Sequence, residues 1–333
     1  MNSFLKSLGS CLILATVPWA GRDNADRVVL FPKLSVGQTF RYRIGYSAKT
    51  NMNTESTVAV PMAPTGGQTN ESLLLLVEVE DLRVDAGRMV ARLRTRIVEA
   101  DAGEPAATAS DGKAPAKRLQ NPDEAAKSPK REKIVEFVLH ADGQVTDVEG
   151  LDRLSADEQA SWQEWVARFG GGAAFPEKGI RPGDKWKAEE QITNALLAGL
   201  SWEKESEYVN DAPCGAMNLT SQGDLAAGEQ AKETCAVILT TAILKQKSSQ
   251  KDATPEDYKL HDLRTMGIAK GKNETITYIS LKTGLVVRAT EDANQSMNVI
   301  VAKTDGSNRV HYMIDAESHA QVMLLAETPA SHP

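Results

Sequence analysis

The chain contains three consecutive segments, Glu274-Thr-Ile-Thr-Tyr-Ile-Ser-Leu281, Lys282-Thr-Gly284 and Leu285-Val-Val-Arg-Ala-Thr-Glu291. β-branched and aromatic residues, which are typical of strands, dominate the first and third segments. The short middle segment ends in glycine, as tight turns between neighbouring strands often do. The three segments therefore predict a β-hairpin.

The wider region Leu263–Leu325 extends this pattern. Apolar residues alternate with polar ones from Arg309 to Asp315, which is the period of a strand with one solvated face. Three further groups rich in Gly, Asn and Asp predict turns, at 271–273, 292–294 and 305–308. Short turns force neighbouring strands to run antiparallel, so we predict an antiparallel meander.

Composition indicates an ordinary globular protein. The chain is 41% hydrophobic, 25% charged and 5% aromatic. Its 333 residues are enough for two domains or one very large sheet. The formal net charge is -7, and no basic block or interleaved aromatic motif stands out. This pattern argues against a nucleic-acid partner.

Residues 1–20 are typical of a signal peptide. Lys6 supplies the positive end, 8–17 form a short apolar core, and Ala20 is a small residue at the expected cleavage region. Cys11 precedes most of the apolar core, whereas a lipoprotein signal needs its cysteine after that core. We expect a periplasmic or extracellular protein, with no transmembrane segment in the mature chain.

Removing the signal peptide leaves two cysteines, Cys214 and Cys235. An even pair in an oxidising compartment predicts one disulfide. A redox or metal site is the alternative, but no CxxC spacing or neighbouring histidine supports it.

The mature chain has two similar halves, residues 21–150 and 179–326. Gly37-Gln-Thr-Phe40 and Gly183-Asp-Lys-Trp186 each begin a strand, and each half later contains a strand, a Gly turn and a strand. We infer a degenerate duplication of 28–150 and 179–325. Residues 101–133 have a disordered composition and interrupt the first half, and 327–333 are expected to be a disordered tail.

Residues 151–178 join the halves and contain a predicted helix. Ser155 and Glu158 form a capping box, and four large apolar side chains follow at helical spacing: Trp162, Trp165, Val166 and Phe169. We favour a core role for this stripe. The alternative is an aromatic ligand platform in which Trp186 and Trp202 join Trp162 and Trp165.

No catalytic motif is present. The sequence lacks GxSxG, HExxH, P-loop and GxGxxG patterns, and its five histidines have no metal-ligand spacing. We therefore predict no catalytic residue, metal or cofactor from the sequence.

Gly183-Asp-Lys-Trp186, the Lys282–Arg288 hairpin and the signal peptide resemble uncharacterised exported bacterial proteins, grouped as domains of unknown function. The segment Tyr278–Glu291 is also similar to the hairpin of lipoprotein carriers of the LolA/LolB type. That resemblance implies an antiparallel sheet folded over a helix, with acyl chains held between them.

The expected fold is mainly β, with antiparallel meanders in two similar halves and one amphipathic helix packed on a sheet, a β-rich α+β protein. We expect a non-catalytic binding or envelope-associated protein, whose partner is an unidentified ligand, with an apolar small molecule or an envelope component as candidates. The alternatives are a hydrolase whose site assembles from residues remote in sequence, and a purely structural surface protein.

Overall fold

The computed structural model describes residues 27–57, 66–85, 88–98, 133–140, 143–169, 175–176, 178–192, 195–215 and 233–328. The strands are β1 Thr39–Ser56, β2 Gly67–Asp85, β3 Arg88–Val98, β4 Ile134–His140, β5 Val145–Glu149, β6 Lys185–Gln191, β7 Leu200–Pro213, β8 Thr234–Gln246, β9 Leu263–Ser280, β10 Val286–Lys303 and β11 Val310–Thr328. The described helices are the 3-10 helix Leu151–Arg153, α1 Ala156–Phe169 and α3 Glu256–Leu260. The expected signal peptide lies outside the described residues, as does the expected insertion except for Lys133.

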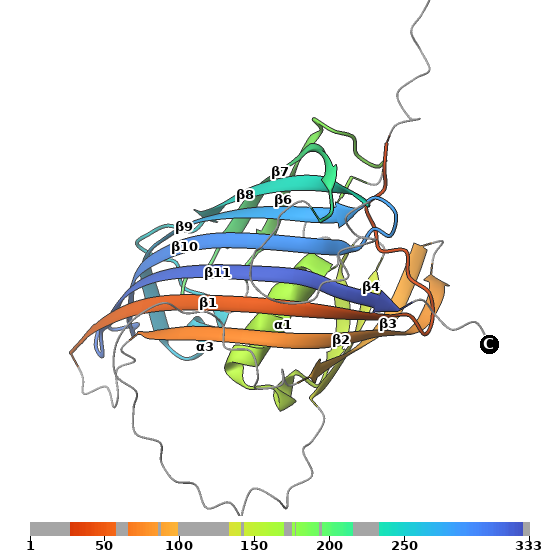
Figure 1. The fold of residues 1–333 in the computed structure, drawn as a ribbon. Helices are drawn as coiled ribbons and strands as arrows, with labels where there is room; N and C mark the ends of the chain where they lie inside the picture. Colours follow the sequence, from red (N-terminus) through yellow and green to blue (C-terminus); the bar gives the residue numbers. More distant parts are fainter. Residues whose placement is uncertain are drawn as a thin grey trace, which may run out of the picture.

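The strands form one antiparallel 11-stranded sheet in the order β5-β4-β3-β2-β1-β11-β10-β9-β8-β7-β6. Figure 1 shows this sheet curving round α1. The predicted fold class, mainly β with a helix packed on an antiparallel sheet, is confirmed. Among the described helices, none is both long and apolar enough to span a bilayer.

The predicted hairpin at Lys282–Gly284 joins β9 and β10. Ser280 N–H donates to Leu285 O at 2.9 Å, which closes the turn. Gly284 has a φ of +70°, and a Cβ there would lie 1.9 Å from Phe31 O. Glycine is therefore required both by the backbone conformation and by the close approach of the N-terminal segment.

Two of the predicted turns are wrong. Residues 271–273 lie within β9 and residues 292–294 within β10, and both strands continue without a break. The two groups pair with each other, Lys272 opposite Asn294 and Asn273 opposite Ala293. Regular pairing across the sheet outweighs the local turn preference of these residues.

The two halves share one sheet, because β1 pairs with β11 along its length. Their opening turns have the same hydrogen bonds. Gly37 N–H donates to Val79 O at 2.9 Å, and Gly183 N–H donates to Tyr208 O at 2.6 Å. A register shift follows each acceptor in β2 and β7. The duplication stays a prediction, which these matching turns support; β11 extends to Thr328, into the predicted tail.

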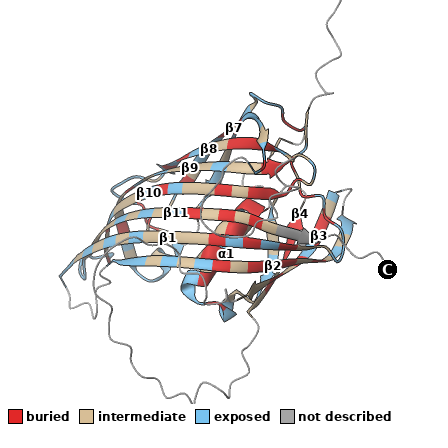
Figure 2. Ribbon diagram, viewed as in Figure 1, coloured by how far each residue is buried: buried red, intermediate tan, exposed pale blue. Residues whose placement is uncertain are grey.

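The capping box at the start of α1 is confirmed. Glu158 N–H donates to Ser155 Oγ at 3.2 Å, and Ser155 N–H donates to Glu158 Oε2 at 2.9 Å. The apolar face of α1 packs into the sheet through rings: the ring centroids of Trp165 and Phe137 of β4 lie 5.9 Å apart, and those of Phe169 and Tyr42 of β1 lie 5.8 Å apart. In Figure 2 the buried residues of the strands gather at the end of the sheet that carries α1.

The predicted disulfide is confirmed. Cys214, just after β7, bonds Cys235 in β8, and both cysteines are buried. A stable disulfide is typical of oxidising compartments, which agrees with an exported or envelope protein.

Candidate functional site

The concave face of the sheet keeps an unfilled space beside the last turns of α1. We call this space of about 310 Å³ the helix-side cavity. Its walls come from Glu164, Ala167 and Arg168 of α1, from Phe175, and from strands of both halves. The strand residues are Tyr46, Glu190, Trp202, Lys204, Ile238, Thr240, Ala242, Asn273, Thr275, Thr277, Ile279, Glu291, Ala293, Gln295 and Ser318. Such a volume lies at the lower end of the usual range for ligand pockets, roughly 300–1,000 Å³.

Small side chains leave this space open. Ala242, Asn273, Ala293 and Ser318 pair in register across β8, β9, β10 and β11, so they form one row on the concave face. Inward-facing positions recur every second residue along a strand, so the next row on the same face lies two residues away. That row contains larger polar side chains. The sheet therefore presents a floor of small residues next to a polar wall.

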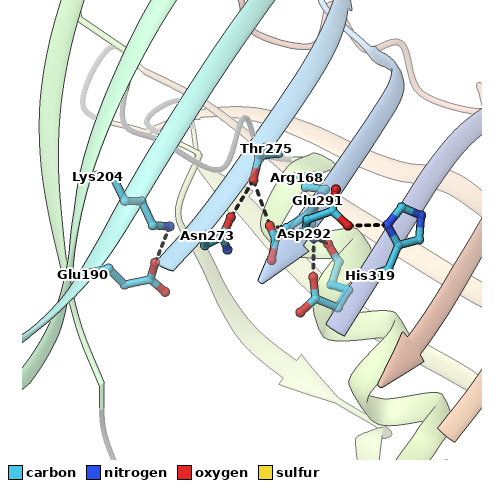
Figure 3. Close-up of polar contacts among 9 residues, drawn as sticks. Arg168, Glu190, Lys204, Asn273, Thr275, Glu291, Asp292 and His319 are labelled. Atoms are coloured by element: carbon cyan, nitrogen blue, oxygen red, sulfur yellow. Dashed lines mark hydrogen bonds and ion pairs between the residues drawn. The ribbon is translucent and has the colours of Figure 1, made fainter. Parts of the chain in front are cut away.

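The polar wall is centred on a buried ion pair between α1 and β10 (Figure 3). Arg168 donates from one terminal nitrogen to Glu291, and from the other to Glu164 Oε2 at 2.5 Å. Thr275 Oγ1 also donates to Glu291 Oε2, at 2.9 Å. The side chain of Arg168 is 7% exposed, and its Nε has no hydrogen-bond partner among the described residues.

We expect Glu291→Gln to lower the free energy of unfolding by roughly 1–3 kcal/mol, because a buried guanidinium loses a charged acceptor. Asp292→Asn is the matched control. Asp292 is the next residue, lies on the opposite face, and its exposed carboxylate contacts His319 at 2.9 Å. Exposed pairs contribute little, so the control should change stability by less than about 0.5 kcal/mol. Urea titration of both variants measures the difference, and equal losses would contradict a structural role for the buried pair.

A second ion pair lies at the far wall of the same cavity. Lys204 of β7 and Glu190 of β6 approach to 2.5 Å between Nζ and Oε2. Figure 3 shows this pair beyond Asn273, across the cavity from Arg168. The lining thus has three carboxylates and two cationic groups, which leaves one excess negative charge.

Tyr46 places a phenol on the wall formed by β1. Burial raises the pKa of Tyr46, and the carboxylates of Glu164, Glu291 and Asp157 raise it further. The phenol therefore stays protonated at and above neutral pH, so that it can both donate and accept hydrogen bonds.

A second space, the loop-side cavity, adjoins the first. It measures about 360 Å³, and Glu190, Trp202 and Gln295 line both cavities. The rest of its lining is mostly apolar and consists of Gln191, Ile192, Ala195, Leu200, Leu244 and Met297. The two cavities therefore meet at Trp202.

The indole of Trp202 packs against a glycine of the sheet. Its Cη2 atom would lie 2.8 Å from a Cβ at position 271, and Leu244 Cβ would lie 3.2 Å from that same Cβ. Real Cβ atoms essentially never approach another atom so closely, so Gly271 is what lets the indole extend across β8 to β9.

The four tryptophans of the predicted aromatic platform occupy different environments. Trp162 and Trp165 are 2% and 0% exposed and lie in the core under α1, as the core interpretation expects. Trp186 is 9% exposed and packs against Phe175 at 5.7 Å between ring centroids. Of the four, Trp202 lines the cavities. The predicted ligand-binding role of these residues stays a prediction.

Most residues of the cavity wall carry no recognisable motif in the sequence. Arg168 and Glu291 are 123 residues apart in the chain, so no motif connects them. A signal was present, because Arg168 follows Trp165 by three residues and therefore shares the buried face of α1. Likewise, Glu291 lies between Ala289 and Ala293, which are both buried on the concave face.

Among the described residues, neither cavity lining includes a histidine, and the hydroxyl of Thr275 has the Glu291 carboxylate as its acceptor. His319 and His311 instead contact Asp292 and Asn298, whose positions alternate with the cavity-facing residues of β10. Within the described ranges, no group of three or more His, Cys, Asp or Glu side chains could hold a metal ion.

Comparison with known proteins gives no family. No family model and no curated protein matches the sequence. Among solved structures, a candidate lipoprotein from Parabacteroides distasonis aligns over 91% of this chain and 100% of its own, with 8% identity and a TM-score of 0.29. A chain from work on the asymmetric conductivity of engineered proteins aligns over 87% and 100%, with 6% identity and a TM-score of 0.17. Scores this low carry no argument about fold or function.

Proposed function

We propose that this protein is an exported, non-catalytic binding protein that holds a small molecule in the two adjoining cavities of the concave face. The observation that carries the proposal is the space left beside α1. A structural protein gains by filling its interior, because unfilled volume loses packing contacts. Here a row of small residues on four neighbouring strands leaves the space beside α1 open.

The lining supports ligand binding. Typical sites combine apolar and aromatic walls with a few polar groups that fix orientation. Trp202 and the apolar side chains of the loop-side cavity supply the aromatic and apolar walls, and the helix-side cavity supplies the polar groups. The curved sheet over a helix also agrees with what the resemblance to lipoprotein carriers implies.

The test uses N-phenyl-1-naphthylamine, an uncharged apolar probe that fluoresces when removed from water. The wild-type protein should take up the probe saturably. Trp202→Ala should weaken binding by about tenfold or more, because a large aromatic contact worth at least about 1.4 kcal/mol is lost.

Tyr278→Ala is the matched control. Tyr278 is also aromatic and contacts Arg288 at 4.3 Å from the ring centroid, and it lines neither cavity. This variant should bind the probe like the wild type. Absence of saturable uptake by the wild type, or equal losses in both variants, would overturn the proposal in favour of a structural role.

A further inference from the structure

The edge strand β6 is complementary to a second copy of itself. We infer that two copies of this chain pair edge to edge through β6, antiparallel and about a twofold axis at Ala188, so that their two sheets become continuous. Three features of the strand support this pairing: its open hydrogen-bonding groups, its regularity and the order of its charges. Glu190 of the same strand lines both cavities, so the pairing would set the cavities of the two copies on either side of the axis.

The backbone of β6 leaves one set of hydrogen-bonding groups open. β6 is the last strand in the sheet order, and among the described strands it pairs with β7 alone. Tyr208 N–H donates to Asp184 O at 3.0 Å at one end of this ladder, and Ile192 N–H donates to Leu200 O at 2.9 Å at the other. Hydrogen-bonded pairs alternate along an antiparallel ladder, so the even-numbered residues of β6 bond to β7. The N–H and C=O groups that point to the open edge are those of Lys185, Lys187, Glu189 and Gln191.

The opposite edge of the sheet is irregular. In β5, Asp147 has a φ of +51°, and the pairing of β4 with β5 shifts register between Glu136 and Val138. Kinks and bulges of this kind disrupt an edge and discourage the addition of another strand. β6 keeps one register with β7 from Lys185 to Gln191. Of the two edges, β6 is therefore the one that can accept another strand.

Symmetry limits how two β6 strands can pair. Antiparallel strands related by a twofold axis keep their concave faces on the same side, so residues opposite each other share a face. Because faces alternate along a strand, the axis must pass through a residue position. An axis at Ala188 puts Lys187 opposite the partner's Glu189. Every other position from 186 to 190 opposes like charges, two lysines at 186 and 187 and two glutamates at 189 and 190.

The order of the charges distinguishes attraction from protection. Lysines on an edge often keep copies apart, but an edge protected in this way carries one sign of charge. β6 instead has lysine in its first half and glutamate in its second, so an antiparallel copy meets opposite charge. Lys187 and Glu189 lie on the convex face in exposed ion pairs with Glu205 and Lys247. Exposed pairs contribute little, so these side chains can turn to a new partner at small cost.

The test is sedimentation velocity of the wild-type protein from roughly 5 to 500 μM at low ionic strength, because edge pairing of two short strands gives a small interface and a weak, reversible dimer. The wild type should shift from monomer to dimer across this range. Lys187→Pro should stay monomeric, because proline lacks the N–H that the edge offers and loses no bond to β7. Lys49→Glu, on the convex face of the central strand β1, is the control and should dimerise like the wild type.

Charge reversal tests the register without changing the backbone. Lys187→Glu and Glu189→Lys each oppose like charges twice across the axis and should weaken the dimer by about tenfold. An equimolar mixture of the two variants should dimerise again, because each lysine then lies opposite a glutamate of the other variant. This result also decides the inference if Lys187→Pro does not fold. A wild type that stays monomeric, a dimer that a folded Lys187→Pro leaves intact, or a mixture that associates no better than its components would each overturn the inference.

Discussion

Trp165→Ala is expected to lower the free energy of unfolding by roughly 3–5 kcal/mol, the usual cost of truncating a buried aromatic residue. Trp165 is fully buried, and its ring contacts four others. The partners are Tyr42, Phe137, Trp162 and Phe169. They come from β1, β4 and α1, so truncation leaves a void where the first half of the sheet meets the helix.

The measurement is the denaturant midpoint of Trp165→Ala beside that of Trp202→Ala. Trp202 is partly exposed and borders open space on the cavity side, so its removal should cost less stability. The two variants separate a core role from a ligand-contact role. If Trp165→Ala retained full stability, or if Trp202→Ala were the more destabilised, this assignment of roles would be wrong.

Removing the disulfide by Cys214→Ala and Cys235→Ala together is expected to cost about 3 kcal/mol in the chain-entropy model. The bond joins residues 21 apart in sequence, so it closes a loop of moderate length in the unfolded chain. Its position ties the end of β7 to the start of β8. The unfolded chain gains freedom without the bond, and the balance shifts away from the folded state.

Urea titration of the double variant and of wild type, each with and without reductant, measures this effect. Reductant should destabilise the wild type by the same amount as the double substitution, and it should leave the variant unchanged. A thiol titration of the denatured, unreduced wild-type protein should find no free thiol at these cysteines. Two reactive equivalents there would contradict the bond.

Local signals in the sequence were enough to predict much of the fold. The capping box of Ser155, the hairpin at Lys282–Gly284 and the cysteine pair each depend on residues close in sequence or few in number. The turns at 271–273 and 292–294 were wrong because those residues lie inside long strands. Their conformation is decided by partners in neighbouring strands, and a single sequence does not identify such partners.

The candidate site was harder to predict for the same physical reason. Trp202 was named as a ligand-contact candidate because it is aromatic, and it does line the cavities. The ion pair of Arg168 with Glu291, and the row of small residues that keeps the space open, form only when α1 meets the sheet. Sequence patterning predicts that a residue faces inward, but not whether another side chain fills the volume opposite it.

The pairing of β1 with β11 has a consequence for the order of events during folding. The sheet is continuous only because a strand from near the beginning of the described chain lies beside the one at its end. The middle of the sheet therefore cannot close until the last strand has been synthesised and, in an exported protein, translocated. Contacts this distant in sequence make folding slow. Until β11 arrives, β1 and β10 are unprotected edges that invite pairing with other chains.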